Sequence, residues 1–292
     1  MRVLMLVATS VATDTRVLRE AQTLVEAGHA VHVIGKDVPA DFVPPGGVTV
    51  TSAGARSAFG APGGGASRSR KLSPPERFAR WALLPQHRNQ AFGSWAVAAV
   101  QQAREHAFDV VHCHDFTALE AGASLARERG VPYVYDSHEL WQGRQRQYRP
   151  TPLQDRREAR VESRLGAAAA AVITVGDGVA DALRDRYGWP HVTVVRNSFP
   201  LPEGSVAGPR DEPTGLVYAG RIDAHRELET ILAAAPSLDL PIHLVGPWDD
   251  TWVGRNADRI AATRTSLEAA IPVEEVTDLL RRCGLALVTH SD

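Results

Sequence analysis

The feature that most constrains this chain is the alternation of short apolar runs with helix-like segments, which starts at the first residues. The run Val3 to Ala8 is continuously apolar, as is typical of a strand that is buried on both faces of a parallel sheet. Residues 17–25 then carry apolar side chains at helical spacing, Gly28 follows the expected helix end, and Val31 to Ile34 is the next apolar run. Such a unit joins two parallel strands by a right-handed crossover. The sequence therefore predicts an α/β fold.

The alternation continues along the chain and restarts after a linker. Further strands are expected in the first part at residues 109–113, 132–135, 171–175 and 192–195, and in the last part at residues 215–219, 242–245, 266–268 and 285–289. Between them, the segment 201–213 is rich in proline, glycine and charge, which is typical of a domain boundary. We expect two doubly wound, Rossmann-like domains, at 1–200 and 214–292, that bind ligands at the carboxyl ends of their strands.

Composition and charge exclude several classes of protein. The 292 residues carry a formal net charge of −2, so no global positive field favours a nucleic-acid partner. No segment approaches the roughly 20 apolar residues that a membrane-spanning helix needs, and the opening MRVLMLVATS is too strand-like for a signal peptide. The two cysteines, Cys113 and Cys283, adjoin apolar runs, which favours reduced thiols in a cytoplasmic protein.

Several common chemistries lack their motifs in this sequence. The turn after the first expected strand, ATSVATDTR, contains no glycine, which argues against the dinucleotide fingerprint of a dehydrogenase. Neither a Walker A sequence nor the Gly-x-Ser-x-Gly elbow of an α/β-hydrolase occurs. His112, His114 and Asp115 are close in sequence, but we expect the two histidine side chains to point to opposite faces of their strand. No metal site is therefore predicted, because metal ligands must converge on one point.

Four segments together carry a resemblance to a known family. In chain order they are DTRVLREAQTLVEAGHAVHVIG at 14–35, DVVHCHDFTALEAG at 109–122, YDSHEL at 135–140 with AVITVGDGVADALRDRYG at 171–188 and VVRNSFP at 194–200, and LVYAGRIDAHRELETIL at 216–232. Their order and spacing resemble those of the retaining glycosyltransferases of family 4, which have the GT-B fold. The resemblance implies two Rossmann-like domains that face a cleft. It also implies a nucleotide-sugar donor held mainly by the C-terminal domain, an acceptor against the N-terminal domain, and no cofactor.

The same resemblance assigns two basic residues to the donor. Arg221 in YAGRID matches the residue that grips the donor diphosphate, and Arg226 matches a second basic position. The departing diphosphate gains negative charge in the transition state, and paired cations stabilise that charge without a metal. The alternative is that both arginines lie on the surface and pair with Asp223 and Glu229.

In the N-terminal half, the resemblance places His138 beside the reacting sugar, where it helps to position that sugar and so belongs to the catalytic site. A histidine between a strand and a loop is otherwise more often structural. His114 and Asp115 are candidates for contact with the acceptor. The alternative for Asp115 is to cap a helix that begins near Thr117.

Further polar residues are candidates for the acceptor side or the cleft. Asp14 and Arg16 lie in the first loop and would meet the acceptor or the donor; the alternatives are an ordinary N-cap and a solvated arginine. Asp177 lies at a strand end that faces the cleft, and its alternative role is that of a turn or cap residue. Asn197 is expected to mark the crossing into the second domain.

A segment rich in glycine, serine, proline and arginine, residues 54–75, is predicted to be a mobile loop. This part of the chain combines positive charge with an aromatic side chain, in Arg68, Arg70, Lys71, Arg77, Arg80 and Trp81. One interpretation is peripheral contact with an anionic membrane or with an acidic acceptor. The alternative, which we favour, is a solvated loop, because the net positive charge is modest and no clean amphipathic helix is expected.

The last expected strand, 285–289, is only the fourth of the second domain. In the resembling enzymes a loop and helix with two glutamates follow it and hold the sugar or ribose of the donor. The expected sheet, ordered 3-2-1-4, would end on an apolar edge strand. We therefore expect an incomplete C-terminal domain and weak activity of this chain alone, unless a partner protein completes the domain.

Two alternative functions stay open. The chain is then either a non-catalytic remnant or partner subunit of a complete glycosyltransferase, or a GT-B sugar-nucleotide epimerase. The sequence names neither the sugar, the base nor the acceptor, because fold rarely fixes substrate.

Overall fold

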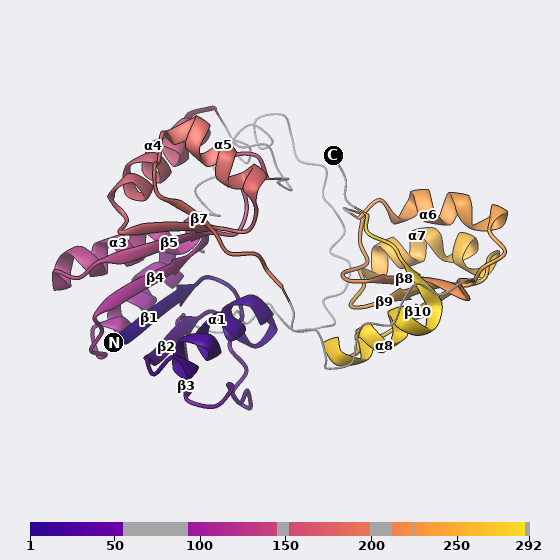
Figure 1. Cartoon of the computed structure of the whole chain (residues 1–292), viewed down its shortest axis with the longest axis horizontal. Coiled ribbons are helices and arrows are strands. Elements are labelled where there is room, and N and C mark those ends of the chain that lie inside the picture. The colour runs from indigo at the N-terminus through magenta and orange to yellow at the C-terminus, as the bar shows by residue number, and fades with distance from the viewer. Residues whose placement is uncertain (55–92, 145–151, 199–211, 225, 290–292) are drawn as a thin grey trace, which may run out of the picture. The chain divides into compact units, whose positions relative to one another are not determined.

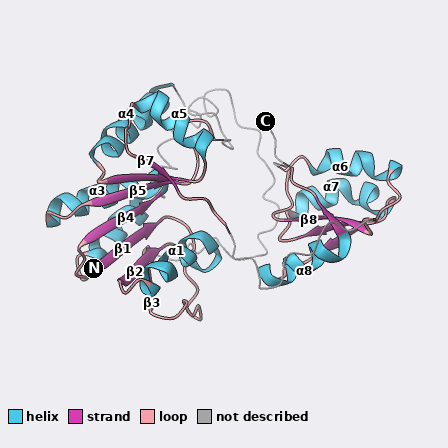
Figure 2. Cartoon of the chain, viewed as in Figure 1, coloured by secondary structure: helices cyan, strands magenta, loops and turns pink. Residues whose placement is uncertain are grey.

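The computed structural model describes residues 1–54, 93–144, 152–198, 212–224 and 226–289. The chain divides into two compact units, Met1–Phe199 and Pro200–Asp292, and each contains one parallel sheet covered by helices (Figures 1 and 2). Most of the predicted mobile loop at 54–75 lies outside the described residues, as do the basic residues and Trp81 discussed with it. Most of the expected linker at 201–213 also lies outside them. Both therefore stay predictions.

The first unit is built on a seven-stranded parallel sheet. Its strands are β1 (Arg2–Val7), β2 (Ala30–Gly35), β3 (Val48–Ser52), β4 (Val110–His114), β5 (Tyr133–Ser137), β6 (Ala171–Thr174) and β7 (Val192–Val194). The spatial order is β3-β2-β1-β4-β5-β6-β7, so the winding of the chain reverses between β1 and β4. Doubly wound sheets bind their ligands outside the carboxyl ends of the strands at such a point of reversal.

Apolar side chains of this sheet are buried on both of its faces. Leu4 and Leu6 of β1 belong to one hydrophobic core, whereas Val3, Met5 and Val7 belong to a second. Because successive side chains of a strand point to opposite faces, β1 must be covered on both sides. The continuous apolar run at the start of the sequence predicts this burial, and the structure confirms it.

Helices cover the two faces of the first sheet (Figure 2). They are α1 (Thr15–Glu26), α3 (Asp115–Arg129), α4 (Pro152–Ala168), α5 (Asp177–Tyr187), the short 3-10 helix Val11–Thr13, and the helical residues 93–103. α1 packs through Val17 and Ala21 on one core, and α3 packs through Leu119 and Leu125 on the other. Helices on both faces are what a buried parallel sheet requires.

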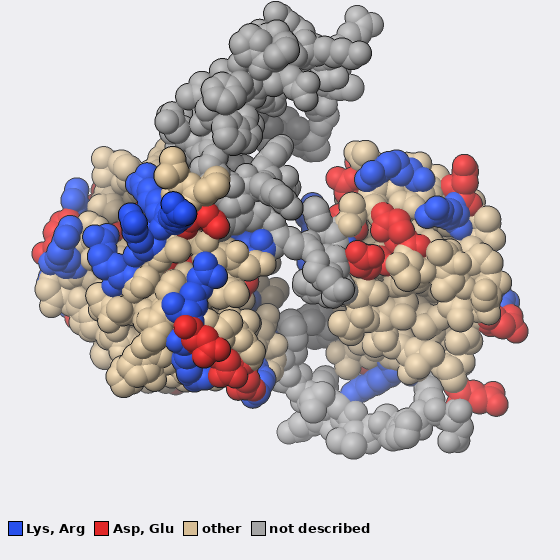
Figure 3. Space-filling view, turned by 90° about the horizontal axis from the view of Figure 1, so that it is seen from above, with Lys and Arg blue, Asp and Glu red and all other residues tan. Residues whose placement is uncertain are grey.

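Basic side chains gather on the outer face of the first unit over α4 and α5 (Figure 3). On α4 the exposed residues of this kind are Arg156, Arg157, Arg160 and Arg164. The inward side of the same helix carries Glu162 and Gly166, which are both buried. Glu162 accepts hydrogen bonds from the hydroxyls of Tyr135 and Tyr187, at 2.8 and 2.7 Å. This buried carboxylate therefore ties α4 to β5 and α5.

The second unit contains a four-stranded parallel sheet in the order β10-β9-β8-β11. Its elements are β8 (Gly215–Ala219), α6 (Leu228–Ala234), the 3-10 helix Ala235–Ser237, β9 (Ile242–Val245), α7 (Asp250–Ala261), β10 (Thr265–Glu268), α8 (Val273–Cys283) and β11 (Gly284–Ala286). Trp252 of α7 is fully buried and packs with Leu228 and Leu244 in the core of this unit. The order 3-2-1-4 expected from the sequence is confirmed.

Three local features differ from the sequence-based expectation. β3 was not expected, and its side chains are mostly half-buried, so it lacks the apolar run that marks the other strands. α3 begins at Asp115, ahead of the expected Thr117, because β4 runs directly into the helix. α6 begins at Leu228, after the expected Arg226, because Glu227 adopts a left-handed backbone conformation with φ of 51°.

Both cysteines, Cys113 and Cys283, are buried and form no disulfide. Burial raises the pKa of the Cys113 thiol, so this side chain behaves as a small apolar group. Within the described ranges, no helix combines the length and apolar character needed to cross a bilayer.

Candidate functional site at the carboxyl edge of the first sheet

An open hollow of about 410 Å³ lies at the carboxyl edge of the first sheet. It is lined by Thr9, Ser10 and residues 13–16 after β1, together with His138, Val175 and Asn197 from the ends of β5, β6 and β7. The hollow therefore lies beside the reversal point between β1 and β4. That is the place where a doubly wound sheet is expected to bind its ligand.

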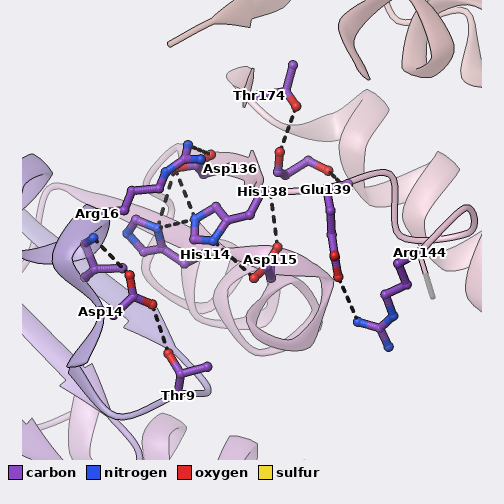
Figure 4. Close-up of polar contacts among 12 residues, drawn as sticks. Thr9, Asp14, Arg16, His114, Asp115, Asp136, His138, Glu139, Arg144 and Thr174 are labelled. Atoms are coloured by element: carbon purple, nitrogen blue, oxygen red, sulfur yellow. Dashed lines mark hydrogen bonds and ion pairs between the residues drawn. The ribbon is translucent and has the colours of Figure 1, made fainter. Parts of the chain in front are cut away.

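His138 points into this region and is held on both of its ring nitrogens (Figure 4). Its Nδ1 lies 3.2 Å from Asp115 Oδ2, and its Nε2 lies 3.2 Å from His114 Nδ1 and 3.6 Å from Asp136 Oδ2. Burial lowers the pKa of His138, but the hydrogen bonds and charges of Asp115 and Asp136 outweigh it and raise that pKa to about 10. His138 is therefore a fixed, cationic group at the edge of the hollow.

Asp115 holds His138 in place with both of its carboxylate oxygens. In addition to the ring contact, Asp115 Oδ1 accepts a hydrogen bond from the backbone N–H of His138 at 3.2 Å. The φ of Asp115 is 63°, a conformation that is costly for a side chain other than glycine. The alternative interpretation of Asp115 as a helix cap near Thr117 is wrong, because α3 starts at Asp115 and its N-cap residue is His114.

Arg16 and Asp14 have different environments in the first loop. Arg16 is 7% exposed, and it donates to Asp136 Oδ1 at 2.6 Å and to Glu20 Oε1 at 2.8 Å. The alternative of a solvated arginine is therefore wrong. Asp14 is the N-cap of α1, as its alternative predicted, and accepts from the Val17 backbone N–H and the Thr9 hydroxyl. Both residues nevertheless line the hollow.

The expectation that His112 and His114 diverge is wrong. Residues two apart on a strand share a face, and the two rings stack with their centroids 4.3 Å apart. His114 is fully buried, and its pKa is lowered to about 4 by burial and by the neighbouring His112. The argument against convergent metal ligands on this strand therefore fails.

Two acidic residues of this site, Asp136 and Glu20, were missed in the sequence. Asp136 is fully buried; burial opposes its ionisation, but the adjacent imidazoles of His112, His114 and His138 outweigh that effect and lower its pKa. Burial and the nearby Asp136 carboxylate raise the pKa of Glu20. Two signals in the sequence could have identified them. Asp136 lies at the end of an otherwise apolar strand, and Glu20 lies one helical turn after Arg16, where it can pair with it.

Asp177 and Asn197 occupy the edge of this region. Asp177 is the first residue of α5, is exposed, and forms an ion pair with Arg196. It is not among the residues that line the hollow. Asn197 does line it, and its side-chain oxygen accepts a hydrogen bond from Arg19 of α1.

The second unit carries the two arginines assigned to the donor at the carboxyl end of β8. Arg221 is exposed, and its Nε donates to Asp223 Oδ2 at 2.9 Å, as the surface alternative predicted. The expected pairing of an arginine with Glu229 is not seen in the described part of the chain, because the Glu229 carboxylate accepts a hydrogen bond from Trp252 Nε1. Arg226 is half-buried, and within the described residues its Nε has no hydrogen-bond partner.

A close backbone approach shapes the same edge of the second sheet. The φ of Gly246, directly after β9, is 145°, and a Cβ at this position would lie 2.0 Å from the Gly220 carbonyl oxygen. The loops after β8 and β9 lie against each other at this point, and therefore only glycine fits there. This contact fixes the backbone that leads into Arg221.

Two solved structures illustrate the similarity of the fold. Sucrose-phosphate synthase from Thermosynechococcus elongatus matches with a TM-score of 0.69 at 15% identity, covering 99% of this chain and 75% of that chain. Anabaena HepE in complex with UDP and glucose matches with a TM-score of 0.64 at 15% identity, covering 99% of this chain and 74% of that chain. Such similarity shows that the fold is GT-B.

Sequence comparisons lead to the same family. Glycogen synthase of Mycobacterium tuberculosis (strain H37Rv) is 30% identical over 134 residues, which are 44% of this chain and 32% of that protein. The match thus spans about a third of the relative's length. The model of Glycosyltransferase Family 4 matches residues 13–201. Because this match covers more than half of its residues, the chain belongs to glycosyltransferase family 4.

Proposed function

We propose that this chain transfers a sugar from a nucleotide-diphosphate sugar to an acceptor, with retention of the anomeric configuration. The observation that carries the proposal is the hollow at the reversal point of the first sheet, with the anchored His138 at its edge, in a chain of glycosyltransferase family 4. A hollow lined by hydroxyls, a carboxylate and cationic groups suits a sugar better than an apolar ligand, because each sugar hydroxyl needs a hydrogen-bond partner.

The second unit would hold the donor. Arg221 and the partly unpaired Arg226 follow the carboxyl end of β8, and two cations there would stabilise the charge of a departing diphosphate. The similar structure of HepE has been determined with UDP-glucose, and that of VinC, with a TM-score of 0.51, with dTDP. These complexes support a nucleotide-sugar donor for this chain. The arginines would neutralise the diphosphate without a metal at that position.

In the reaction, the bond between the anomeric carbon and the diphosphate breaks, and the diphosphate keeps the electron pair. An acceptor hydroxyl forms the new bond to the same carbon and passes its proton to an oxygen of the departing diphosphate. His138 would contact the reacting sugar, while Asp14, Arg16 and the loop after β1 would contact the acceptor. His114 and Asp115 would act by holding His138, since both touch its ring.

A panel of UDP, GDP, TDP and ADP sugars tests this proposal. We expect one base to raise the melting temperature and to support release of nucleotide in the presence of an acceptor extract. For Arg221→Ala, the donor concentration that gives half of the melting shift should rise at least tenfold. Arg264→Ala is the matched control, because Arg264 is also exposed and also pairs with an aspartate, at 3.0 Å.

The outcomes separate the competing interpretations. A melting shift without nucleotide release would contradict transfer and favour a binding partner of another glycosyltransferase. No shift with any donor would contradict the donor site itself. Equal loss in Arg221→Ala and Arg264→Ala would contradict the assignment of Arg221 to the diphosphate.

A further inference from the structure

We propose that a divalent transition-metal ion, of which Zn²⁺ is the type, binds inside the first unit between Glu20, His112, His114 and Asp136. These residues come from α1, β4 and β5, and they contact Arg16 and His138, which line the hollow. Each offers one nitrogen or oxygen atom, and the four atoms lie within 4.8 Å of one another. The inference rests on this cluster alone and does not depend on the proposed transfer reaction.

The spacing of the four atoms is that of ligands around a small ion. Asp136 Oδ2 lies 3.5 Å from both His112 Nε2 and His114 Nδ1, and Glu20 Oε2 lies 3.9 Å from the same two nitrogens. A point equidistant from four atoms at such spacings lies roughly 2.2–2.5 Å from each, a few tenths of an ångström beyond a typical Zn–N or Zn–O bond. A tetrahedral site then forms when the stacked rings of His112 and His114 rotate toward the ion, and His114 Nδ1 exchanges its contact with His138 Nε2 for the metal.

The same atoms are otherwise unexplained. Within the described residues, Glu20 Oε2, His112 Nε2 and Asp136 Oδ2 are buried and have no hydrogen-bond partner. Asp136 is fully buried and His112 is 8% exposed, so bulk water does not satisfy them. Buried polar atoms without partners are rare and call for an unseen ion or water. A metal ion satisfies all three at once.

A water molecule is the competing occupant of this space. A water stands about 2.7–3.0 Å from each partner, so it requires the four atoms to move apart, whereas an ion requires them to move together. The donor set also selects the kind of metal. Two imidazole nitrogens favour Zn²⁺ and its neighbours over Mg²⁺ and Ca²⁺, which prefer oxygen ligands only.

Arg16 completes the surroundings that a metal site needs. It donates to the other carboxylate oxygen of each acidic residue, at 2.8 Å to Glu20 Oε1 and at 2.6 Å to Asp136 Oδ1. Each carboxylate therefore keeps its second oxygen directed at the histidines. Hydrogen bonds of this kind orient metal-ligating carboxylates and are usual around bound metals.

Binding of Co²⁺ to the full chain tests the site directly. The chain, freed of any histidine tag and stripped with a chelator, is titrated with Co²⁺, whose tetrahedral complexes absorb visible light. We expect one Co²⁺ per chain, an intense visible spectrum, and displacement by Zn²⁺. His112→Asn and His114→Asn should each weaken binding by roughly 10–100-fold or more.

A matched histidine pair provides the control. His32 and His106 also stack, with their centroids 3.8 Å apart, but lie outside the four-residue cluster. His32→Asn should therefore bind Co²⁺ as the unchanged chain does. If a β4 variant fails to fold, Glu20→Gln replaces it, because that side chain is 21% exposed and lies on a helix.

Three results would overturn the proposal. These are the absence of saturable Co²⁺ binding to the folded chain, a spectrum typical of octahedral rather than tetrahedral Co²⁺, and equal affinities of the unchanged chain and the β4 variants. Because the readout is metal content and absorption, a chain that transfers no sugar would still confirm or refute it.

Discussion

Asp115 is the residue on which the position of His138 most depends. Its left-handed backbone, with φ of 63°, lets β4 pass into α3 without a loop and turns the carboxylate toward His138. This conformation costs most residues other than glycine about 1–2 kcal/mol, and aspartate tolerates it better than alanine because its side chain can hydrogen-bond locally. Such strain gathers at functional sites, where surrounding contacts hold it. Two hydrogen bonds from His138 to the Asp115 side chain are those contacts.

Substitution of Asp115 separates its backbone role from its side-chain role. Asp115→Gly relieves the backbone strain, so we expect a melting temperature close to that of the unchanged chain. Asp115→Ala keeps the strain and loses the carboxylate, so it should be less stable than Asp115→Gly by about 1 kcal/mol. Both variants should lose at least tenfold in the rate of sugar transfer, because neither holds His138. Denaturant melts and donor turnover measure the two effects; equal stability of the variants would refute the strain.

His32 predicts a dependence of stability on pH. It stacks on His106 and contacts the hydroxyls of Thr49 and Thr51, at 2.8 and 3.1 Å. Burial and the neighbouring His106 lower the pKa of His32 to about 4. The unfolded chain binds a proton at this side chain below about pH 6.5, whereas the folded chain does so only near pH 4. Stability is therefore lost as the pH falls through this window.

Comparison with His32→Val isolates this contribution from those of the other buried histidines. Urea melts at pH 7 and pH 5 should show a smaller loss of stability in His32→Val than in the unchanged chain. An equal loss in both proteins would show that the pKa of His32 is not lowered by folding.

At the scale of elements, two helices of the first unit pack closely against their neighbours through glycine. A Cβ at Gly122 of α3 would lie 2.0 Å from Cys113 Sγ, and a Cβ at Gly166 of α4 would lie 2.1 Å from the Trp189 ring. A Cβ at Gly178 of α5 would meet nothing within 4 Å. Packing therefore requires glycine at Gly122 and Gly166, whereas it does not at Gly178.

Alanine substitution tests this difference. We expect Gly122→Ala and Gly166→Ala each to lower the free energy of unfolding by about 1–3 kcal/mol through overpacking. Gly178→Ala should be neutral or stabilising by up to about 1 kcal/mol, because alanine favours helix. Guanidinium melts compare the three. Stabilisation by all three substitutions would mean that helix propensity outweighs packing at these sites.

Elements with a strong apolar signal were predictable from the sequence, and those without one were not. β1 and α1 followed from periodicity, and the order of the second sheet was expected from the resemblance to the family. β3 was missed because it has no continuous apolar run, although Val48, Thr49, Val50 and Thr51 alternate with the period of a half-buried strand. The cluster around His112 was missed because the side chains of residues two apart on a strand were expected to diverge, and because its four members come from three elements.

At the scale of the whole molecule, each unit contains its own hydrophobic cores. Among the described residues, two buried clusters belong to the first unit and two to the second. All residues of the hollow and of the four-residue cluster lie in the first unit, whereas Arg221 and Arg226 lie in the second. Units with separate cores are expected to fold separately.

A fragment of residues 1–199 tests this independence. We expect it to melt cooperatively and to bind Co²⁺ as the full chain does, but to lose the melting shift with nucleotide sugars. Differential scanning calorimetry of the full chain should then show a transition that matches the fragment. A fragment without a cooperative transition would mean that the first unit depends on the second.

The alternation along β4 has a consequence for how the chain reaches its native state. His112 and His114 face the polar cluster, while Val111 and Cys113 face the core, and His114 pairs with Asp136 in the β4–β5 register. A slip of one residue would drive both imidazoles into the core and leave Cys113 beside Arg16. Misaligned strands would bury polar rings without partners and so fall apart before they propagate. The two histidines of β4 thus disfavour out-of-register pairing of this strand during folding, whatever ligand they later bind.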